Sequence, residues 1–114
     1  GNDEVIVIEC KTIKESGFNK FSSVSRQLKA YSDLLKLNDL KVIKSLLIAP
    51  EFSDEFINET ELEYDLNLSL ISASSLVTIL DGFKKSKKHK QFPYKLLMRD
   101  VLIKEDRILK AISK

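Results

Sequence analysis

The stretch that decides the fold is Val5-Ile6-Val7-Ile8-Glu9-Cys10-Lys11, where four β-branched residues lead directly into an acid, a cysteine and a lysine. β-Branched side chains are restricted at χ1 and fit a pleated strand, so the stretch predicts a buried strand. Alternate residues of a strand share a face, which places Glu9 and Lys11 together and Cys10 on the opposite face. We expect Cys10 to be buried there as a small apolar side chain.

Glu9 and Lys11 are the unusual part of this strand, because charged residues rarely continue an apolar run. The two side chains start about 7 Å apart along the strand. Burying either charge without a partner costs free energy, so each must be neutralised by the other, by a metal ion or by an anionic substrate.

Composition limits the classes of protein to which the chain can belong. Its 114 residues are 43% hydrophobic and 32% charged, which is typical of one globular domain. The net charge of +2 does not by itself indicate a nucleic-acid-binding protein, and the single cysteine excludes an internal disulfide. No apolar run is long enough to span a membrane, so we expect a cytoplasmic protein without a membrane partner.

The remaining pattern alternates helices with strands. The first expected helix is capped by Ser22 or Ser23 and has Val24, Leu28, Tyr31 and Leu35 in the core. A strand over residues 41–49, a helix capped by Ser53 with Phe56, Ile57 and Leu62 inward, and a strand over residues 66–71 follow it. The next helix is capped by Ser72 or Ser74 and has Leu76, Ile79, Leu80 and Phe83 inward. A helix after Pro93 has Tyr94, Leu97, Met98 and Val101 on its apolar side, and residues 103–112 form a final short helix or continue that helix. This alternation predicts an α/β fold, with a small mixed or parallel sheet flanked by helices.

Glu9-x-Lys11 at the end of a strand resembles the second half of the PD-(D/E)xK nuclease signature. A polar loop, a helix carrying Gln27 and a second apolar strand follow it. This order is similar to the C-terminal part of the cleavage domain of FokI-like type IIS restriction endonucleases. The resemblance implies a restriction-endonuclease-like fold over residues 1–114 and hydrolysis of DNA phosphodiester bonds with Mg²⁺, or with Mn²⁺ in its place.

The resemblance also implies roles for three residues. Glu9 would bind the metal, Lys11 would stabilise the transition state or activate water, and Gln27 would orient water or phosphate. The family signature further needs an aspartate on a preceding strand, but Asp3 would lie about 20 Å from Glu9 if the intervening residues are extended. We therefore expect the chain to be a fragment that lacks its N-terminal strands, and to be a poor nuclease without that part of the parent protein.

Lysines outside this motif are candidates for contacts with the DNA backbone. Lys14 and Lys20 lie close in sequence to the proposed site. Lys84, Lys85, Lys87 and Lys88 belong to a basic run that is either a solvated loop or a phosphate-attracting surface. The expected partners are DNA, with RNA as an alternative substrate, and a second copy of the chain for cutting a duplex.

Two other interpretations of the sequence remain open. The first is a catalytically degenerate nuclease fold that serves protein or nucleic-acid interaction. The second is an unrelated small α/β binding module in which Glu9 and Lys11 form an ordinary ion pair. Cleavage of plasmid DNA that depends on both residues separates the nuclease from these alternatives.

Overall fold

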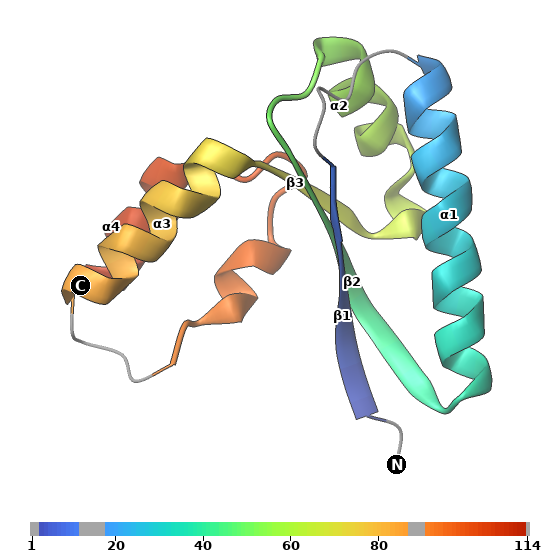
Figure 1. Ribbon diagram of the computed structural model, residues 1–114, viewed down its shortest axis with the longest axis horizontal. Helices are drawn as coiled ribbons and strands as arrows, with labels where there is room; N and C mark the ends of the chain where they lie inside the picture. The colour runs from blue at the N-terminus through green and yellow to red at the C-terminus, as the bar shows by residue number, and fades with distance from the viewer. Residues whose placement is uncertain (1–2, 12–17, 87–90, 114) are drawn as a thin grey trace.

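Three parallel strands form the sheet at the centre of the computed structural model (Figure 1), which describes residues 3–11, 18–86 and 91–113. The strands are β1 (Asp3–Cys10), β2 (Leu40–Ala49) and β3 (Leu68–Ser72), and they lie side by side in chain order. A short segment around Leu102 returns to the outer edge of β3, where it forms an isolated bridge with Leu70. The predicted small sheet is therefore confirmed, and it is wholly parallel.

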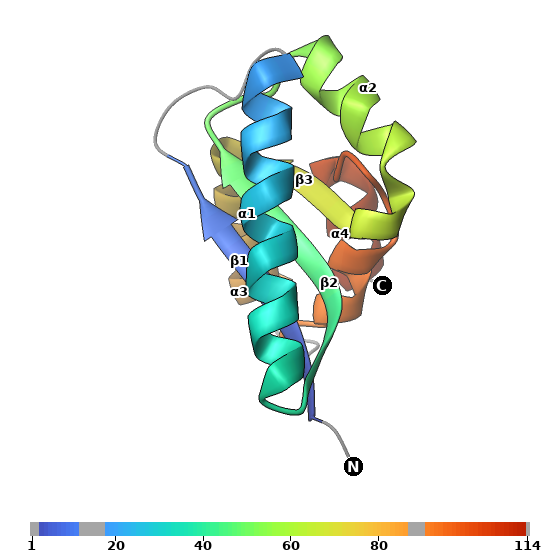
Figure 2. The same cartoon turned by 90° about the vertical axis from the view of Figure 1, so that its right-hand side faces the viewer.

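Helices cover both faces of this sheet, as the two perpendicular views show (Figures 1 and 2). The helical elements are α1 (Phe18–Leu37), α2 (Asp54–Leu62), the 3-10 turn η1 (Tyr64–Leu66), α3 (Ala73–Ser86), the 3-10 turn η2 (Tyr94–Met98) and α4 (Glu105–Ile112). Helices α1 and α2 lie on one side of the sheet, and α3 and α4 lie on the other. None of the helices in the described ranges is both long enough and apolar enough to cross a lipid bilayer.

The two faces carry separate hydrophobic cores. The core under α1 and α2 is formed by Phe21, Val24, Leu28, Leu47, Phe56, Leu66, Leu68 and Leu70. The core under α3 and α4 is formed by Leu46, Ile71, Ile79, Ile103 and Ile108. Because β3 is covered on both faces, residues 68–71 are all buried, and the predicted alternation of buried and exposed positions is not observed there.

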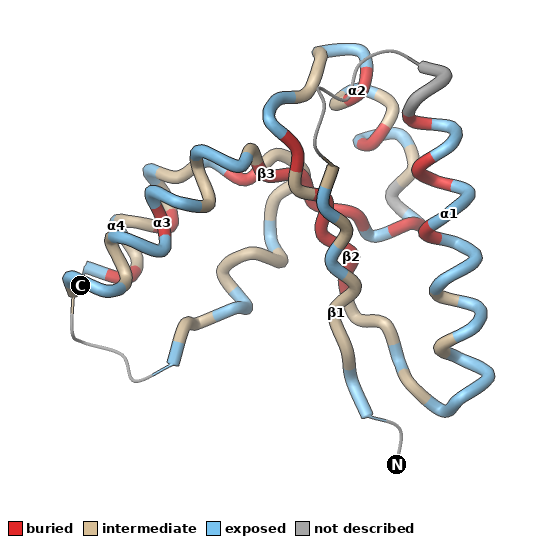
Figure 3. Tube along the Cα trace, viewed as in Figure 1, coloured by how far each residue is buried: buried red, intermediate tan, exposed pale blue. Residues whose placement is uncertain are grey.

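Strand β1 is less buried than the sequence predicts. Ile8 is 57% exposed and Cys10 is also exposed, so the expectation of a buried cysteine is wrong (Figure 3). The reason is that α3 and α4 pack on β2 and β3, and the core beneath them includes no described residue of β1. Val7, on the other face of β1, packs against the core under α1.

Two of the predicted helix caps are confirmed and one is wrong. The Ser53 hydroxyl accepts a hydrogen bond of 3.1 Å from the Phe56 amide at the start of α2. The Ser72 hydroxyl accepts one of 3.1 Å from the Ser75 amide at the start of α3. Helix α1 begins at Phe18, before the serines expected to cap it, and this extra turn buries Phe21 edge-on against the ring of Phe56.

Several side chains assigned to the core are instead exposed, namely Tyr31 (40%), Leu62 (72%), Leu80 (41%) and Tyr94 (47%). For Tyr31 the cause is the width of the sheet, because β3 pairs only with residues 45–49 of β2 and leaves no third strand beneath the second half of α1. Leu62 is the last residue of α2, and Tyr94 begins a 3-10 turn where an α-helix was predicted. The final helix is confirmed, with Ile108 and Ile112 buried.

Candidate active site

The three residues predicted to carry catalysis lie together at the carboxyl end of β1. The Lys11 Nζ lies 3.6 Å from the Glu9 Oε1 and donates a hydrogen bond of 3.3 Å to the Gln27 Oε1. Glu9 and Lys11 come from consecutive positions on one face of the strand, whereas Gln27 reaches them from α1. A residue 16 positions further along the chain thus completes the cluster.

The backbone explains why these side chains meet. The Lys11 amide donates a hydrogen bond of 2.8 Å to the carbonyl of Ile48, which extends the pairing between β1 and β2 beyond Cys10. This bond keeps Lys11 extended and on the same side of the sheet as Glu9. On α1, Gln27 directly precedes Leu28, which is 1% exposed and fixes that turn of the helix against the core. The cluster therefore rests on two rigid elements.

The cluster is partly accessible to solvent. The side chains of Lys11 and Glu9 are 25% and 27% exposed. An ammonium group has three N–H donors, and Gln27 accepts from one of them. The arrangement can therefore offer a carboxylate and a cationic donor to the same incoming group, such as a phosphate.

The described part of the chain places the carboxylate of Glu9 beside Lys11 at this position. No group of three or more His, Cys, Asp or Glu side chains in the described part of the chain is arranged to hold a metal ion. Asp3 and Glu9 belong to the same strand, so they lie about 20 Å apart and do not share an ion. Mg²⁺ in proteins is usually held by one or two carboxylates together with waters and substrate phosphates. The described residues thus supply one ligand but do not form a metal site by themselves.

Of the lysines predicted to contact nucleic acid, Lys84 and Lys85 lie away from this cluster. Lys84 and Lys85 are exposed in the last turn of α3, on the other side of the sheet from α1 (Figure 1). Lys20 falls in the first turn of α1. Lys14, Lys87 and Lys88 lie outside the described residues.

Lys44 is a charged residue that the sequence analysis did not single out. It lies within β2, is 7% exposed, and donates a hydrogen bond of 3.0 Å from its Nζ to the Asn67 Oδ1. Burial lowers the pKa of Lys44, and the nearby negative charge of Asp100 opposes that shift. A signal was present in the sequence, because Lys44 is the only charged residue between positions 42 and 49.

The geometry of these two regions is the basis for assigning a function to the chain. A scan against protein-family models, a search of curated proteins and a search of solved structures each found no match.

Proposed function

We propose that this chain carries the E-x-K half of the active site of a Mg²⁺-dependent DNA endonuclease with a restriction-endonuclease-like fold. The observation that supports the proposal is the meeting of Glu9, Lys11 and Gln27 at the carboxyl end of β1. Open parallel sheets bind ligands at the carboxyl ends of their strands. An acid that can bind a metal ion and a cation that can stabilise a phosphate oxygen are two of the groups that metal-dependent phosphodiester hydrolysis uses.

Each residue has a role that follows from its contacts. The Lys11 ammonium would donate to a non-bridging oxygen of the scissile phosphate and stabilise the negative charge that grows in the transition state. Gln27 would hold Lys11 in that direction through the hydrogen bond already present. Glu9 would be one ligand of Mg²⁺, which when bound acts as a Lewis acid on the phosphate. A second acid is proposed to come from the N-terminal part of the parent protein.

The nature of the substrate follows from the same proposal. Duplex DNA has two backbones to cut, so one such site per chain calls for two copies of the chain on the duplex. We therefore propose DNA and a second copy as partners, with Lys14, Lys20, Lys84, Lys85, Lys87 and Lys88 as candidates for backbone contacts and the cytoplasm as the compartment.

Binding of Mn²⁺ in the presence of DNA tests the role of Glu9 directly. Mn²⁺ is paramagnetic, so loss of the free-ion signal in electron paramagnetic resonance measures its binding to the chain mixed with a short duplex. We expect Glu9→Gln to weaken this binding about tenfold or more, because it removes a charged oxygen ligand. The matched control is Glu61→Gln on the exposed surface of α2. Equal binding by wild type and Glu9→Gln would contradict the proposal.

Cleavage of supercoiled plasmid tests the role of Lys11. We expect weak nicking with Mn²⁺ and less with Mg²⁺, because the second acid is proposed to come from the parent protein. Whatever cleavage occurs should fall about a hundredfold in Lys11→Ala, since a lost electrostatic contact to a transition-state oxyanion has an effect of this size. Cleavage that survives unchanged in both Lys11→Ala and Glu9→Gln arises elsewhere and would exclude the assignment.

A catalytically degenerate domain is the second candidate function. It is favoured by the contacts inside the cluster, because Lys11 is already held between Glu9 and Gln27 as in a structural ion pair. Such a domain would bind DNA or a protein without a metal ion. A gel-shift experiment in EDTA distinguishes the two functions, since retention of a duplex equally with and without Mg²⁺, and equally by Glu9→Gln, favours the degenerate domain.

A further inference from the structure

A second group of charged side chains surrounds a pocket at the amino end of β2, far along the sheet from the carboxyl end of β1. Residues 40–44 of β2 extend beyond the part that pairs with β3, so their edge is open there. The end of α1 and the residues just before β3 lie beside this open edge. The resulting cavity has a volume of about 330 Å³. Its polar lining includes Ser32 and Lys36 from α1, Lys41 and Lys44 from β2, and Asn67 from the start of β3.

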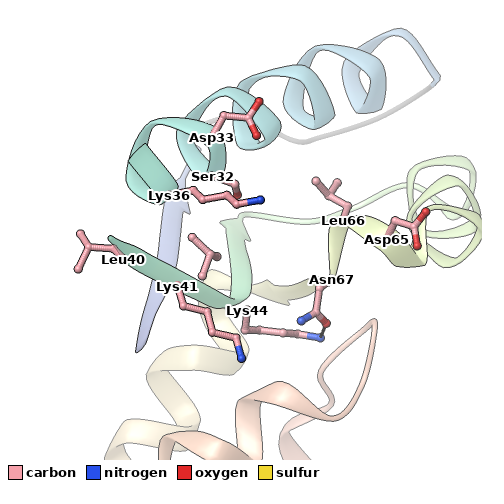
Figure 4. Close-up of a pocket in the computed structure, with 10 residues that line it drawn as sticks. Ser32, Asp33, Lys36, Leu40, Lys41, Lys44, Asp65, Leu66 and Asn67 are labelled. Carbon is pink, nitrogen blue, oxygen red and sulfur yellow. Dashed lines mark hydrogen bonds between the residues drawn. The ribbon is translucent and has the colours of Figure 1, made fainter. Parts of the chain in front are cut away.

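Three lysines give the pocket its positive charge. In Figure 4 the ammonium of Lys36 lies on one side of the cavity, and those of Lys41 and Lys44 lie on the opposite side. Asp33 and Asp65 also line the pocket; the close-up shows the Asp65 carboxylate directed away from these ammonium groups and the Asp33 carboxylate on the same side of the cavity as Lys36. Among the residues that the structure describes, no carboxylate forms an ion pair with any of the three lysines.

Lys44 is the member of this set that most needs a counter-charge. It is 7% exposed, and the hydrogen-bond partner that the described residues provide for its Nζ is the neutral amide of Asn67, at 3.0 Å. Asn67 is held in place, because its Nδ2 donates a hydrogen bond of 2.7 Å to the carbonyl of Ile43. A buried ammonium whose bonded acceptor is neutral is costly; the charge of Asp100 offsets part of that cost, and an anion in the pocket would offset more.

The helix end beside the pocket does not compete for the lysines. The last carbonyls of an α-helix carry partial negative charge, and Lys36 lies in the last turn of α1. These carbonyls are already occupied by hydrogen bonds from the Asn38 amide to Leu35, from the Asn38 Nδ2 to Leu34, and from the Asp39 amide to Lys36, of 3.0, 3.0 and 3.1 Å. Among the described residues, these helix-end carbonyls accept no hydrogen bond from the three lysines.

We propose that this pocket binds a phosphate monoester, with the ammonium groups of Lys41 and Lys44 on the phosphate oxygens and that of Lys36 adding positive charge from the facing wall. Lysine is a compact cation that suits phosphate, whereas planar carboxylates are recognised best by arginine, and no arginine lines this pocket. The cavity is larger than a phosphate group, and Leu40 and Leu66 supply apolar walls for an organic substituent. The proposal does not depend on the nuclease assignment, because none of its residues belongs to the cluster around Glu9.

Titration of the ¹⁵N-labelled chain followed by NMR tests the site. Inorganic phosphate and phenyl phosphate are the probes, and benzoate is the carboxylate comparison. We expect saturable shifts of the backbone amides of residues 40–44, 66 and 67, with phenyl phosphate binding more tightly than inorganic phosphate and benzoate binding most weakly. Absence of saturable shifts in these amides, or tighter binding of benzoate than of phenyl phosphate, would overturn the proposal.

Substitution of the lysines identifies the contacts. Lys36 and Lys41 are exposed, so Lys36→Gln and Lys41→Gln should fold normally, and each should weaken phenyl phosphate binding roughly three- to tenfold. Lys44→Met should remove binding altogether. Lys29→Gln is the matched control, because Lys29 lies on α1 outside the pocket and pairs at the surface with Glu63. Loss of affinity in Lys29→Gln equal to that in Lys36→Gln would show a general charge effect and contradict the site.

Discussion

Lys11 at the end of β1 and Lys44 within β2 have different partners for their positive charges. At the carboxyl end of β1, Lys11 is flanked by a carboxylate and an amide, and about a quarter of its side chain remains exposed. In β2, Lys44 is almost fully buried, and its hydrogen bond goes to an uncharged amide. The first lysine keeps about a quarter of its exposure and has gained a bonded counter-charge, whereas the second has lost most of its exposure and gained a neutral acceptor, with the charge of Asp100 acting on it without an ion pair.

The free-energy cost of burying a charge therefore lies at Lys44 rather than at the cluster around Glu9. An exposed ion pair contributes little to stability, so the cluster around Glu9 is free to be shaped by what it binds. A buried cation without a bonded acid destabilises the folded state. Removal of a charged side chain or of its partner should therefore change stability differently in the two regions.

Removing the partner of Lys44 should have the largest effect on stability. Asn67→Ala deletes both side-chain hydrogen bonds and places alanine at a φ of 52°, a left-handed conformation that alanine disfavours. We expect it to lower the free energy of unfolding by about 2 kcal/mol in urea denaturation. Asn67→Gly tolerates the backbone conformation and should cost less than Asn67→Ala. If the two variants are equally stable, backbone conformation contributes nothing at this position.

Removing the charge of Lys44 should have a smaller effect of opposite sign. Lys44→Met keeps most of the side-chain volume without the buried charge, so we expect a gain of about 1 kcal/mol in the free energy of unfolding at neutral pH. The exposed Asn67 amide can then bond to water. A loss of stability in Lys44→Met would mean that the hydrogen bond to Asn67 outweighs desolvation.

The pH dependence of stability gives a separate test of Lys44. Because burial lowers the pKa of Lys44 in the folded protein, the unfolded chain binds more protons between that lowered pKa and the ordinary pKa of lysine. Stability should therefore rise with pH across this window. The same urea denaturation in Lys44→Met should lack this rise, and an identical pH dependence in both proteins would contradict the assignment to Lys44.

The smallest effect is expected at Glu9. Glu9→Gln removes a partly exposed ion pair whose atoms are 3.6 Å apart, so the free energy of unfolding should change by about 0.5 kcal/mol or less. Thermal unfolding followed by circular dichroism measures this change. A large destabilisation would show that Glu9 has a structural role and would weaken its assignment to the proposed metal site.

Local sequence was sufficient to predict the parts of this molecule that depend on neighbouring residues. The caps at Ser53 and Ser72 and the shared face of Glu9 and Lys11 follow from spacings of two or three residues. The association of Gln27 with Lys11 spans 16 residues. It was expected because of the resemblance to nucleases rather than because of any local pattern.

The burial of individual side chains was not predicted from the sequence where it depends on how far the sheet and the helices extend. Whether Ile8 or Tyr31 is buried is decided by which elements cover β1 and by where β3 stops, and an apolar pattern carries no such information. The same holds for Lys44, because its partner Asn67 is 23 residues away and lies just before β3. A lysine inside an apolar run signals an unusual environment, but the residue that accommodates it has to be found in three dimensions.

The order of the strands has a consequence for how the chain folds. Since β1, β2 and β3 are neighbours in the sheet in the same order as in the sequence, each strand emerging during synthesis finds its partner already made. The sheet can therefore grow in one direction by adding strands at a single edge, without opening an earlier pair. The segment around Leu102 arrives last and closes that edge against β3. Each pairing still closes a long crossover, because Asp3 pairs with Leu40 and Ser45 with Leu68, so loop closure rather than strand order limits the rate at which this sheet forms.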